Sequence, residues 1–383
     1  MLRRWTGLLS ALAGCRGAAD SEGSVLSKCW GSAVPGLSIS RPALDETAVY
    51  ATDGVGSLNA FAKSDGRRLW HTQLTAGVIR GMNVVVASGV AVAATRDSTV
   101  GVDAATGRLL WQYAAPLDRQ ENPVAPEPGY VGFTRMDTDG ESVFIPAWGA
   151  SVSAVDLRTG QRRWLWSTPD TAAFRSGSMG VRRAGDTLYA TVWRYTDPFG
   201  GKTEQWLVAL DRRTGRELWR KTFPPFTGGV SVQGAPVIIG DIVIFSVVGG
   251  DEFAVNRFTQ QLVWTFRSSP IQATVAESEG FGSTVYHDAG DQTIVALDAA
   301  TGTVLWKGSY GGQATVDFLV SERFVYVSVA RDLVVLDRTN GREVQRIRRA
   351  SSLQNRIFSS PAAFAEGRIY VAADYEVLCY KER

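Results

Sequence analysis

The sequence is poor in the side chains that build thiol, imidazole and metal chemistry. It has 3 cysteines and 2 histidines in 383 residues, and no two cysteines are adjacent. His71 and His287 each stand beside the end of a predicted strand, with no nucleophile or metal ligand implied nearby, so we interpret both as surface or packing residues. The net charge of +2 lacks the basic footprint of a nucleic-acid-binding domain. These shortages predict a protein with no metal site and no nucleic-acid partner.

Long apolar runs are also missing after the first 13 residues, so no later segment could span a membrane as a helix. Tryptophan and glycine are abundant instead, with 12 and 40 residues. Most of the tryptophans close one recurring phrase: an apolar strand, then Asp-x-x-Thr-Gly, then a short strand ending in Trp. A phrase repeated at a regular spacing indicates a repeat architecture. The positions predicted to lock successive repeats together are Trp30, Trp70, Trp111, Trp164, Trp219, Trp264 and Trp306.

Each phrase predicts a β-hairpin. Glycine at the last turn position permits the left-handed backbone that closes such a loop, and the leading Asp can accept hydrogen bonds from amides two residues on. Another apolar strand precedes each hairpin, as at 242–245, and a fourth, often with Pro or Gly, precedes that one, as at 233–237. Four strands per repeat predict one blade of a β-propeller.

Spacing gives the blade count. Successive Trp positions from Trp70 lie 41, 53, 55, 45 and 42 residues apart, and the next repeat ends after 39 residues in Gln345 instead of Trp. The last unit has three strands, and Trp30 lies in period 40 residues before Trp70. The sequence therefore predicts an all-β, eight-bladed propeller over residues 29–383, whose last blade is completed by the N-terminal strand. Gln345 marks the repeat where the lock between blades is expected to be weakest.

The same register predicts a disulfide. Asp298 faces Thr303 in the intact hairpin, which places Ala296 opposite Leu305. Cys379 aligns with Ala296 and Cys29 with Leu305, so the two cysteines are expected to face each other across antiparallel strands. Two separate buried thiols are the alternative, and the bridge requires an oxidising compartment.

The N-terminus predicts export. Two arginines precede a short apolar run that ends in Leu12-Ala13-Gly14-Cys15, which resembles the lipobox of bacterial lipoproteins. The resemblance implies that residues 1–15 hold the signal and the lipidated Cys15, and that residues 16–28 form a flexible tether. Arg16 after that cysteine suggests a periplasmic protein anchored to the outer membrane. A signal peptide with a chance cysteine is the alternative.

The Asp-x-x-Thr-Gly-x-x-x-Trp phrase resembles the repeat of pyrroloquinoline-quinone enzymes and their cofactor-free relatives. With the lipobox, the length and the N-terminal closure, the chain most resembles the BamB-like family of outer-membrane assembly lipoproteins. This resemblance implies a monomeric, non-catalytic scaffold without a cofactor, whose partners are envelope proteins such as the barrel-assembly machine. In the quinone enzymes the cofactor lies between a Trp and two adjacent cysteines, whereas Cys15, Cys29 and Cys379 are far apart.

Partner contacts are expected where the repeat is broken. In the BamB-like family a Leu-x-Leu-Arg stretch follows the third Trp, and Phe174 and Arg175 stand at its last two positions here. An Asp-x-Asp stretch of the family is replaced by Ser231-Val232-Gln233, which puts the same contact chemistry in doubt. Arginines recur in the first strands of blades 1 to 4 and predict a charged channel mouth. The residues of this arc are Arg41, Arg80, Arg135, Arg175 and, in blade 5, Gln233.

An insertion in blade 4 is the other candidate contact. It spans residues 193–202 and is expected to expose Trp193, Tyr195 and Phe199, a composition typical of interface hot spots.

Two other functions stay open from the sequence alone. One is a propeller lipoprotein that binds a small ligand or polysaccharide, and the other is a degenerate quinone-dependent dehydrogenase.

Overall fold

The computed structural model describes most of the propeller. The described residues are 24–36, 40–75, 84–95, 98–114, 135–147, 149–168, 176–196, 202–227, 232–247, 251–268, 275–276, 278–289, 291–312, 314–329, 332–348 and 362–383. Cys15, Arg80, Phe174, Arg175 and Phe199 lie outside them. Among the residues described, no helix is long and apolar enough to cross a membrane.

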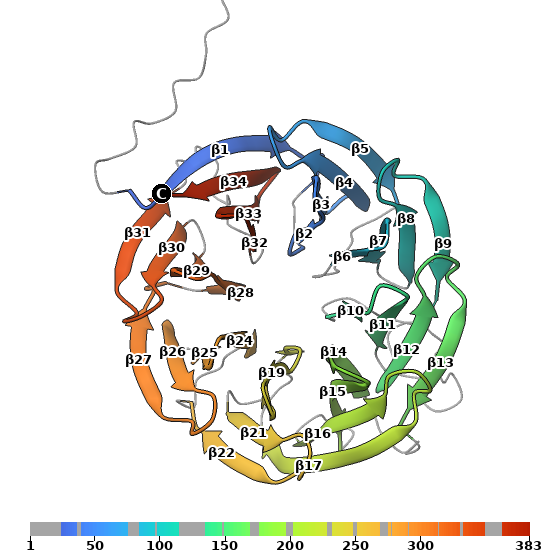
Figure 1. The fold of residues 1–383 in the computed structure, drawn as a ribbon, viewed down its shortest axis with the longest axis vertical. Coiled ribbons are helices and arrows are strands. Elements are labelled where there is room, and N and C mark those ends of the chain that lie inside the picture. Colours follow the sequence, from blue (N-terminus) through green and yellow to red (C-terminus); the bar gives the residue numbers. More distant parts are fainter. Residues whose placement is uncertain are drawn as a thin grey trace, which may run out of the picture.

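Eight four-stranded antiparallel sheets stand around a central axis, which confirms the predicted eight-bladed propeller (Figure 1). Within each blade the strands run in order from the channel to the rim. Blades 1 to 4 contain β2 (Ala43–Leu44), β3 (Ala48–Thr52), β4 (Ser57–Ala62) and β5 (Arg68–Gln73); β6 (Val84–Ala87), β7 (Val90–Ala94), β8 (Thr99–Asp103) and β9 (Leu109–Tyr113); β10 (Asp137–Thr138), β11 (Ser142–Ala147), β12 (Ser151–Asp156) and β13 (Arg162–Ser167); β14 (Ser176–Ala184), β15 (Thr187–Tyr195), β16 (Lys202–Asp211) and β17 (Glu217–Thr227).

The second half of the ring ends in the blade that joins the two chain ends. Blade 8 has the order β32-β33-β34-β1, so the predicted closure by the N-terminal strand is confirmed. Blades 5 to 8 contain β19 (Val237–Ile239), β20 (Ile242–Ser246), β21 (Glu252–Asn256) and β22 (Leu262–Phe266); β24 (Ser278–Phe281), β25 (Thr284–Asp288), β26 (Thr293–Asp298) and β27 (Val304–Ser309); β28 (Ala314–Val320), β29 (Phe324–Val329), β30 (Asp332–Asp337) and β31 (Glu343–Arg348); β32 (Ala363–Ala365), β33 (Arg368–Ala373), β34 (Glu376–Glu382) and β1 (Leu26–Ala33).

Strand β1 begins at Leu26, three residues before the predicted domain start at residue 29, because Leu26 is already buried in the core of blades 7 and 8. One further pair of short strands is parallel, β18 (Val232–Gln233) with β23 (Val275–Ala276).

The Asp-x-x-Thr-Gly turns fold as the sequence predicts. In blade 2 the Asp103 Oδ1 atom accepts hydrogen bonds from the Thr106 amide and hydroxyl, both at 2.8 Å. The Gly107 amide donates to the Asp103 carbonyl at 2.8 Å, with a glycine φ of 74°. These bonds hold the turn closed and lower the pKa of Asp103, chiefly through the side-chain bond to Thr106.

Each of these turns receives a tryptophan from the preceding blade. The Trp111 Nε1 atom donates to the Leu157 carbonyl of blade 3 at 2.9 Å, and a Cβ on Gly160 would lie 2.6 Å from the same indole. Glycine in this turn therefore serves both the backbone conformation and the close approach of the indole. Equivalent bonds to the next blade are made by Trp30, Trp70, Trp164, Trp264 and Trp306.

A β-bulge before each tryptophan corrects the predicted register. Ala296 pairs with Trp306 and Leu297 with Val304, so Leu305 is the extra residue and does not face Ala296 directly. The bulge puts the large indole opposite a small residue of the neighbouring strand, which a direct pairing would not do. Gly101 shows how tight this contact is, because a Cβ there would lie 2.1 Å from Trp111.

The cysteines follow the same rule. Cys379 pairs with Trp30, and Cys29 is the bulged residue, so the expected direct pairing of Cys29 with Cys379 is wrong by one position. In a bulge, two residues of one strand oppose one residue of the other, so Cys29 still lies next to Cys379. Both are free thiols in this structure, Cys29 exposed and Cys379 buried.

Gln345 replaces tryptophan where the ring lacks a receiving turn. In blade 8, β34 and β1 are not joined by a turn, so the place of the Asp turn is taken by the end of β34 and the start of β1. The Arg383 amide donates to the Val25 carbonyl there at 3.0 Å. The Gln345 Oε1 atom accepts from the Val25 and Leu26 amides at 2.9 and 2.8 Å. A polar clamp on the start of β1 thus takes the place of the indole lock.

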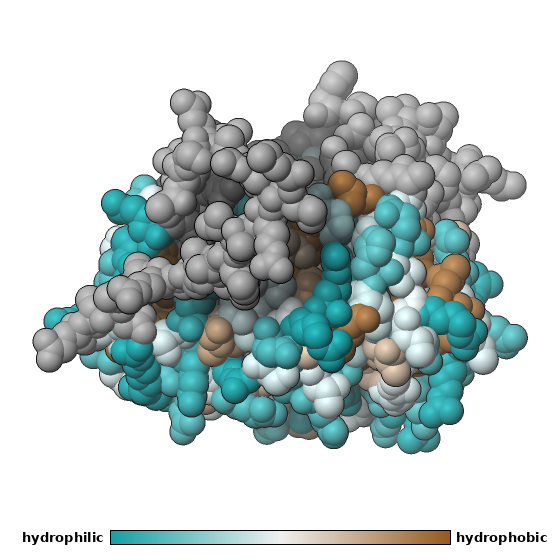
Figure 2. All heavy atoms as spheres, turned by 90° about the horizontal axis from the view of Figure 1, so that it is seen from above, coloured by the Kyte–Doolittle hydropathy of each residue, from teal (hydrophilic) through white to brown (hydrophobic). Residues whose placement is uncertain are grey.

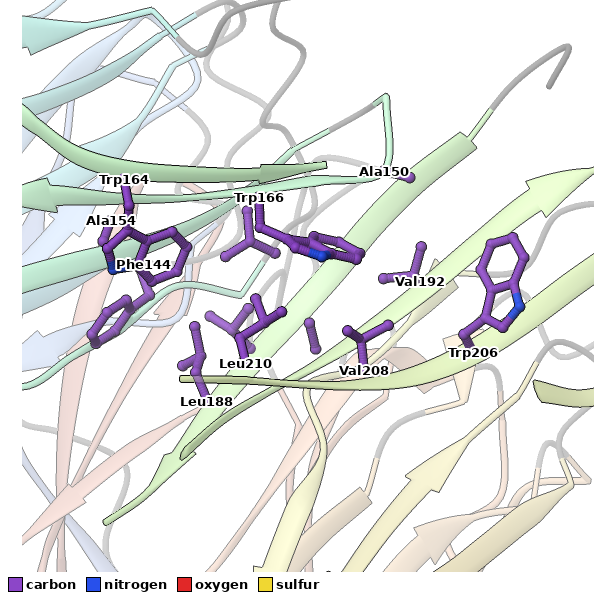
Figure 3. Close-up of a cluster of buried hydrophobic side chains, with 13 residues drawn as sticks. Phe144, Ala150, Ala154, Trp164, Trp166, Leu188, Val192, Trp206, Val208 and Leu210 are labelled. Atoms are coloured by element: carbon purple, nitrogen blue, oxygen red, sulfur yellow. The ribbon is translucent and has the colours of Figure 1, made fainter. Parts of the chain in front are cut away.

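Apolar cores fill the wedges between blades. Phe144, Trp164 and Trp166 of blade 3 pack against Leu188 and other apolar side chains of blade 4 (Figure 3). At the rim, exposed apolar side chains such as Leu305 and Phe258 are interspersed with hydrophilic ones, and Figure 2 shows brown patches broken up by teal on this side of the disc. The apolar cores that stabilise the ring therefore lie between neighbouring blades and not at the rim.

Candidate functional site

The central channel is crossed by an ion pair. Arg41 lies two residues before β2, the inner strand of blade 1, and Glu279 lies on β24 of blade 6, on the facing side of the channel (Figure 1). The Arg41 Nη1 atom lies 2.6 Å from the Glu279 Oε1 atom. The Arg41 Nε atom also donates to the Ala362 carbonyl of blade 8 at 3.2 Å. One arginine therefore ties blades 1, 8 and 6 together through the channel.

Two more arginines act on the same carboxylate. Burial raises the pKa of Glu279, but the charges of Arg41, Arg135 and Arg182 together lower it by more, so the pKa lies below its ordinary value. Arg135 precedes β10 and is buried, with its carbonyl accepting from the Val181 amide at 3.1 Å. Glu279 is consequently an ionised carboxylate within a basic group, which we call the channel cluster: Arg41, Arg135, Arg182 and Glu279.

The channel cluster changes the interpretation of the predicted arginine arc. Arg41 is paired with Glu279 across the channel, and Arg135 is buried near enough to lower the pKa of that carboxylate, so these two arginines act on an acid of the ring itself. Gln233 lies on β18, whose backbone pairs with Ala276. Arg182 and Glu279 were not identified from the sequence, because each is an ordinary charged residue in a strand and only the ring closure brings them together.

Blade 4 is the longest blade, and it buries the aromatics that were expected to be exposed. Trp193 is fully buried and Tyr195 is 8% exposed, and their rings meet edge to face at 5.3 Å between centroids. Strand β16 pairs with β15 along its whole length and β14 pairs with it as far as Arg194, so Trp193 lies between Gly177 and Gln205. The prediction that Trp193 and Tyr195 offer an exposed contact surface is therefore wrong.

Polar groups on the same hairpin are accessible instead. The Arg194 Nη2 atom lies 2.7 Å from Glu204 Oε2, and the guanidinium stacks 5.1 Å from the Trp206 ring centroid. Trp166 of blade 3 donates from Nε1 to Glu217 Oε2 at 3.0 Å, which links this blade to its neighbour. The long hairpin of blade 4 is therefore held by an ion pair of its own and by a hydrogen bond to blade 3.

A cavity of about 610 Å³ lies between blades 3 and 4, on the side of the Asp turns. Arg163 and Arg212 line it together with Asp139 and Glu141. The arginines are already paired with acids: Arg163 with Asp156 at 2.7 Å and Arg212 with Asp139. Arg213 also lines the cavity and pairs with Asp186 at 3.6 Å, so each of its arginines is already engaged in an ion pair.

His287 belongs to a buried polar cluster between blades 5 and 6. Its Nδ1 atom lies 3.2 Å from the Glu252 Oε1 atom, and its Nε2 atom lies 3.1 Å from the Ser268 hydroxyl. The hydroxyls of Ser246 and Ser278 also contact Glu252 Oε1. The interpretation of His287 as a packing residue holds, and His71 is exposed on β5. Glu252, Ser246 and Ser268 come from blade 5, and nothing in the sequence around His287 indicates these partners.

Comparison with known proteins agrees with this architecture. The family model described as outer membrane protein assembly factor BamB matches residues 20–196 and 203–383. The chain belongs to this family. BamB of Shewanella oneidensis is 20% identical over 358 residues, which cover 86% of this chain and 81% of that protein. BamB of Yersinia pestis is 29% identical over 285 residues, covering 70% of this chain and 66% of that protein.

Quinone-dependent dehydrogenases match a smaller part. The 1-butanol dehydrogenase (quinone) of Thauera butanivorans is 29% identical over 136 residues, and this chain spans only 19% of its length. Among solved structures, BamB from Moraxella catarrhalis superposes with a TM-score of 0.70 at 17% identity, covering 93% of this chain and 100% of that chain. The quinohemoprotein alcohol dehydrogenase of Comamonas testosteroni reaches 0.71 at 13% identity, covering 93% and 76%. At such identities these superpositions establish the shared propeller fold.

Proposed function

We propose that this BamB-family chain is a non-catalytic envelope scaffold that supports the assembly of outer-membrane β-barrel proteins. The observation that carries the proposal is the extent of the match: the family model covers nearly all of the propeller, and the chain spans 81% of a relative named as an assembly factor. A ring whose blades are locked by indoles and polar clamps is a rigid platform. Rigid platforms hold partners in place at small entropic cost.

A catalytic role is less well supported by the residues present. The resemblance to quinone enzymes implies a cofactor between a Trp and two adjacent cysteines, and the three cysteines here are separated by at least 14 positions. The Arg41–Glu279 ion pair joins blade 1 to blade 6 across the channel. The matches to the 1-butanol dehydrogenase (quinone) of Thauera butanivorans and the quinoprotein ethanol dehydrogenase of Pseudomonas aeruginosa also span less than a fifth of those proteins.

The docking surface that we propose lies on the loops carried by blades 3 and 4. Phe174 and Arg175 precede β14, and Phe199 lies between β15 and β16. Strands β15 and β16 have 9 and 10 residues, against 5 and 6 in blade 6. Buried Trp193 and Tyr195 brace this extension from within, and we assign the recognition itself to Arg175 and the two phenylalanines. Phenylalanine and arginine are both enriched at protein interfaces.

Anchoring completes the proposal. We infer that Cys15 carries the lipid, that the protein is periplasmic, and that the residues between Cys15 and β1 tether the ring to the outer membrane. Ten residues separate Cys15 from Leu26, and an extended chain of that length reaches about 35 Å. The ring would then stay within roughly one domain diameter of the membrane surface.

Co-purification tests the proposal. An affinity-tagged full-length chain is expressed in its native envelope, solubilised in detergent, purified and analysed by mass spectrometry. Barrel-assembly proteins are expected in amounts comparable to the bait. Recovery of the bait without such partners, together with tight stoichiometric binding of added pyrroloquinoline quinone and Ca²⁺, would overturn the scaffold and favour the dehydrogenase.

A further inference from the structure

The ring is closed without a covalent link. In seven blades a turn joins the third strand to the outer strand, whereas in blade 8 the outer strand β1 and its neighbour β34 come from opposite ends of the chain. Their pairing runs from Leu26 with Glu382 to Ala33 with Glu376. We call this strand pair the seam. Its integrity depends on backbone hydrogen bonds, on the packing of Leu26 and Trp30, and on the Gln345 clamp.

Both cysteines of the folded domain lie at the seam. Cys29 is the bulged residue of β1, and Cys379 pairs with the next residue, Trp30. The Cys379 thiol is buried, and the Cys29 thiol is close enough to raise its pKa. Side chains in this relation are near the separation that a disulfide spans.

We propose that a disulfide between Cys29 and Cys379 closes the seam covalently after folding. The inference uses only the exported location from the proposed function, since disulfides persist in oxidising compartments. The oxidant is a protein or small-molecule disulfide of the envelope. The loop closed by the bond holds about 350 residues, so the bond turns an almost complete ring into a closed one.

The exposures of the two sulfurs set the order of the steps. The exposed Cys29 thiolate attacks one sulfur of the oxidant, which forms a mixed disulfide and releases one thiolate. The Cys379 thiolate then attacks the Cys29 sulfur and displaces the second thiolate. Two protons and two electrons pass in total from the cysteines to the oxidant, which leaves as two thiols.

The second step is the slow one. Burial raises the pKa of the Cys379 thiol, and this effect remains when Cys29 is held in the mixed disulfide and carries no charge. Little of the attacking thiolate is therefore present at neutral pH. A Cys29 adduct should consequently be detectable before the ring closes, and its decay should speed up as the pH rises.

Alkylation of the full-length chain purified from envelopes tests the bond. The protein is unfolded in N-ethylmaleimide with and without prior reduction, and the peptides containing the two cysteines are identified by mass spectrometry. The bond predicts no label on Cys29 or Cys379 without reduction and label on both after it. Full labelling of both cysteines in the unreduced protein would overturn the proposal.

Oxidised glutathione tests the order of the steps on the reduced, folded chain. The wild type should pass through a glutathione adduct on Cys29 to the internal disulfide. Cys379→Ser should stop at the adduct, and Cys29→Ser should form none because Cys379 is buried. Both variants retain the Gln345 clamp, and circular dichroism checks that they fold. An adduct on Cys379 in Cys29→Ser, or a stable adduct in the wild type, would contradict the mechanism.

Discussion

The contact between a tryptophan and the glycine of the next blade can be measured with a matched pair of substitutions. Gly215 lies in the Asp turn of blade 4 with a φ of 71°, and a Cβ there would lie 2.5 Å from the Trp164 indole of blade 3. Gly185 lies in the β14–β15 turn of the same blade with a φ of 60°, and a Cβ there would have nothing within 4 Å. Gly215→Ala and Gly185→Ala therefore share the backbone penalty and differ in the contact with the indole.

The magnitudes follow from that difference. A left-handed conformation costs an alanine about 1–2 kcal/mol, which applies to both variants. Forcing an extra methyl into a packed contact costs about 1–3 kcal/mol, which applies only to Gly215→Ala. The expected losses in the free energy of unfolding are about 1–2 kcal/mol for Gly185→Ala and about 2–5 kcal/mol for Gly215→Ala.

Thermal unfolding followed by tryptophan fluorescence measures the melting temperature of the two variants. At about 2.1 cal/mol/K per residue, a ring of this size has an unfolding entropy near 0.7 kcal/mol/K, so each kcal/mol lowers the Tm by about 1.4 °C. Gly215→Ala should melt roughly 1–4 °C below Gly185→Ala. Equal melting temperatures for the two variants would refute the idea that these glycines make room for the inter-blade indoles.

Three further changes probe other parts of the account. Gln345→Ala leaves the Leu26 amide without its side-chain acceptor, so we expect a loss of about 1–3 kcal/mol and faster hydrogen exchange at the start of β1, measured by mass spectrometry. Asp156→Asn removes a carboxylate whose pKa the Arg163 side chain lowers to about 2. Because the folded-state pKa lies below the ordinary value of 3.8, the wild type loses this stabilisation as the pH falls from about 4 to about 2, and the variant should show a flatter acid-unfolding profile. Glu279→Gln breaks the ion pair across the channel and should cost about 1–3 kcal/mol in a urea titration, and an unchanged midpoint would show that the pair contributes nothing.

The repeat made the fold predictable, because turn, strand and indole positions recur with nearly the same residues. The bulge before each Trp was not predicted, since apolar residues occupy both the bulged and the paired positions, as at Leu305 and Trp306. Only the size of the residue opposite, such as Ala296 or Gly101, gives a hint of it.

Contacts between blades were predictable where the repeat encodes them and were missed elsewhere. Trp164 reaches its carbonyl in the next blade as the period predicts. Glu279 meets Arg41 only because blades far apart in sequence face one channel. Trp193 was assigned to the surface because aromatics in an insertion are typical of interfaces, but long neighbouring strands bury it.

The central claim is that the loops of blades 3 and 4 hold an envelope partner, and one comparison of co-purified proteins tests it most directly. Tagged wild type, Arg175→Glu and the control Arg158→Glu are purified in parallel from solubilised envelopes, where Arg158 is an exposed residue of the Asp turn in blade 3. The account predicts that barrel-assembly proteins accompany the wild type and Arg158→Glu and are strongly depleted with Arg175→Glu. Equal recovery with all three baits, or no assembly protein with any of them, would contradict it.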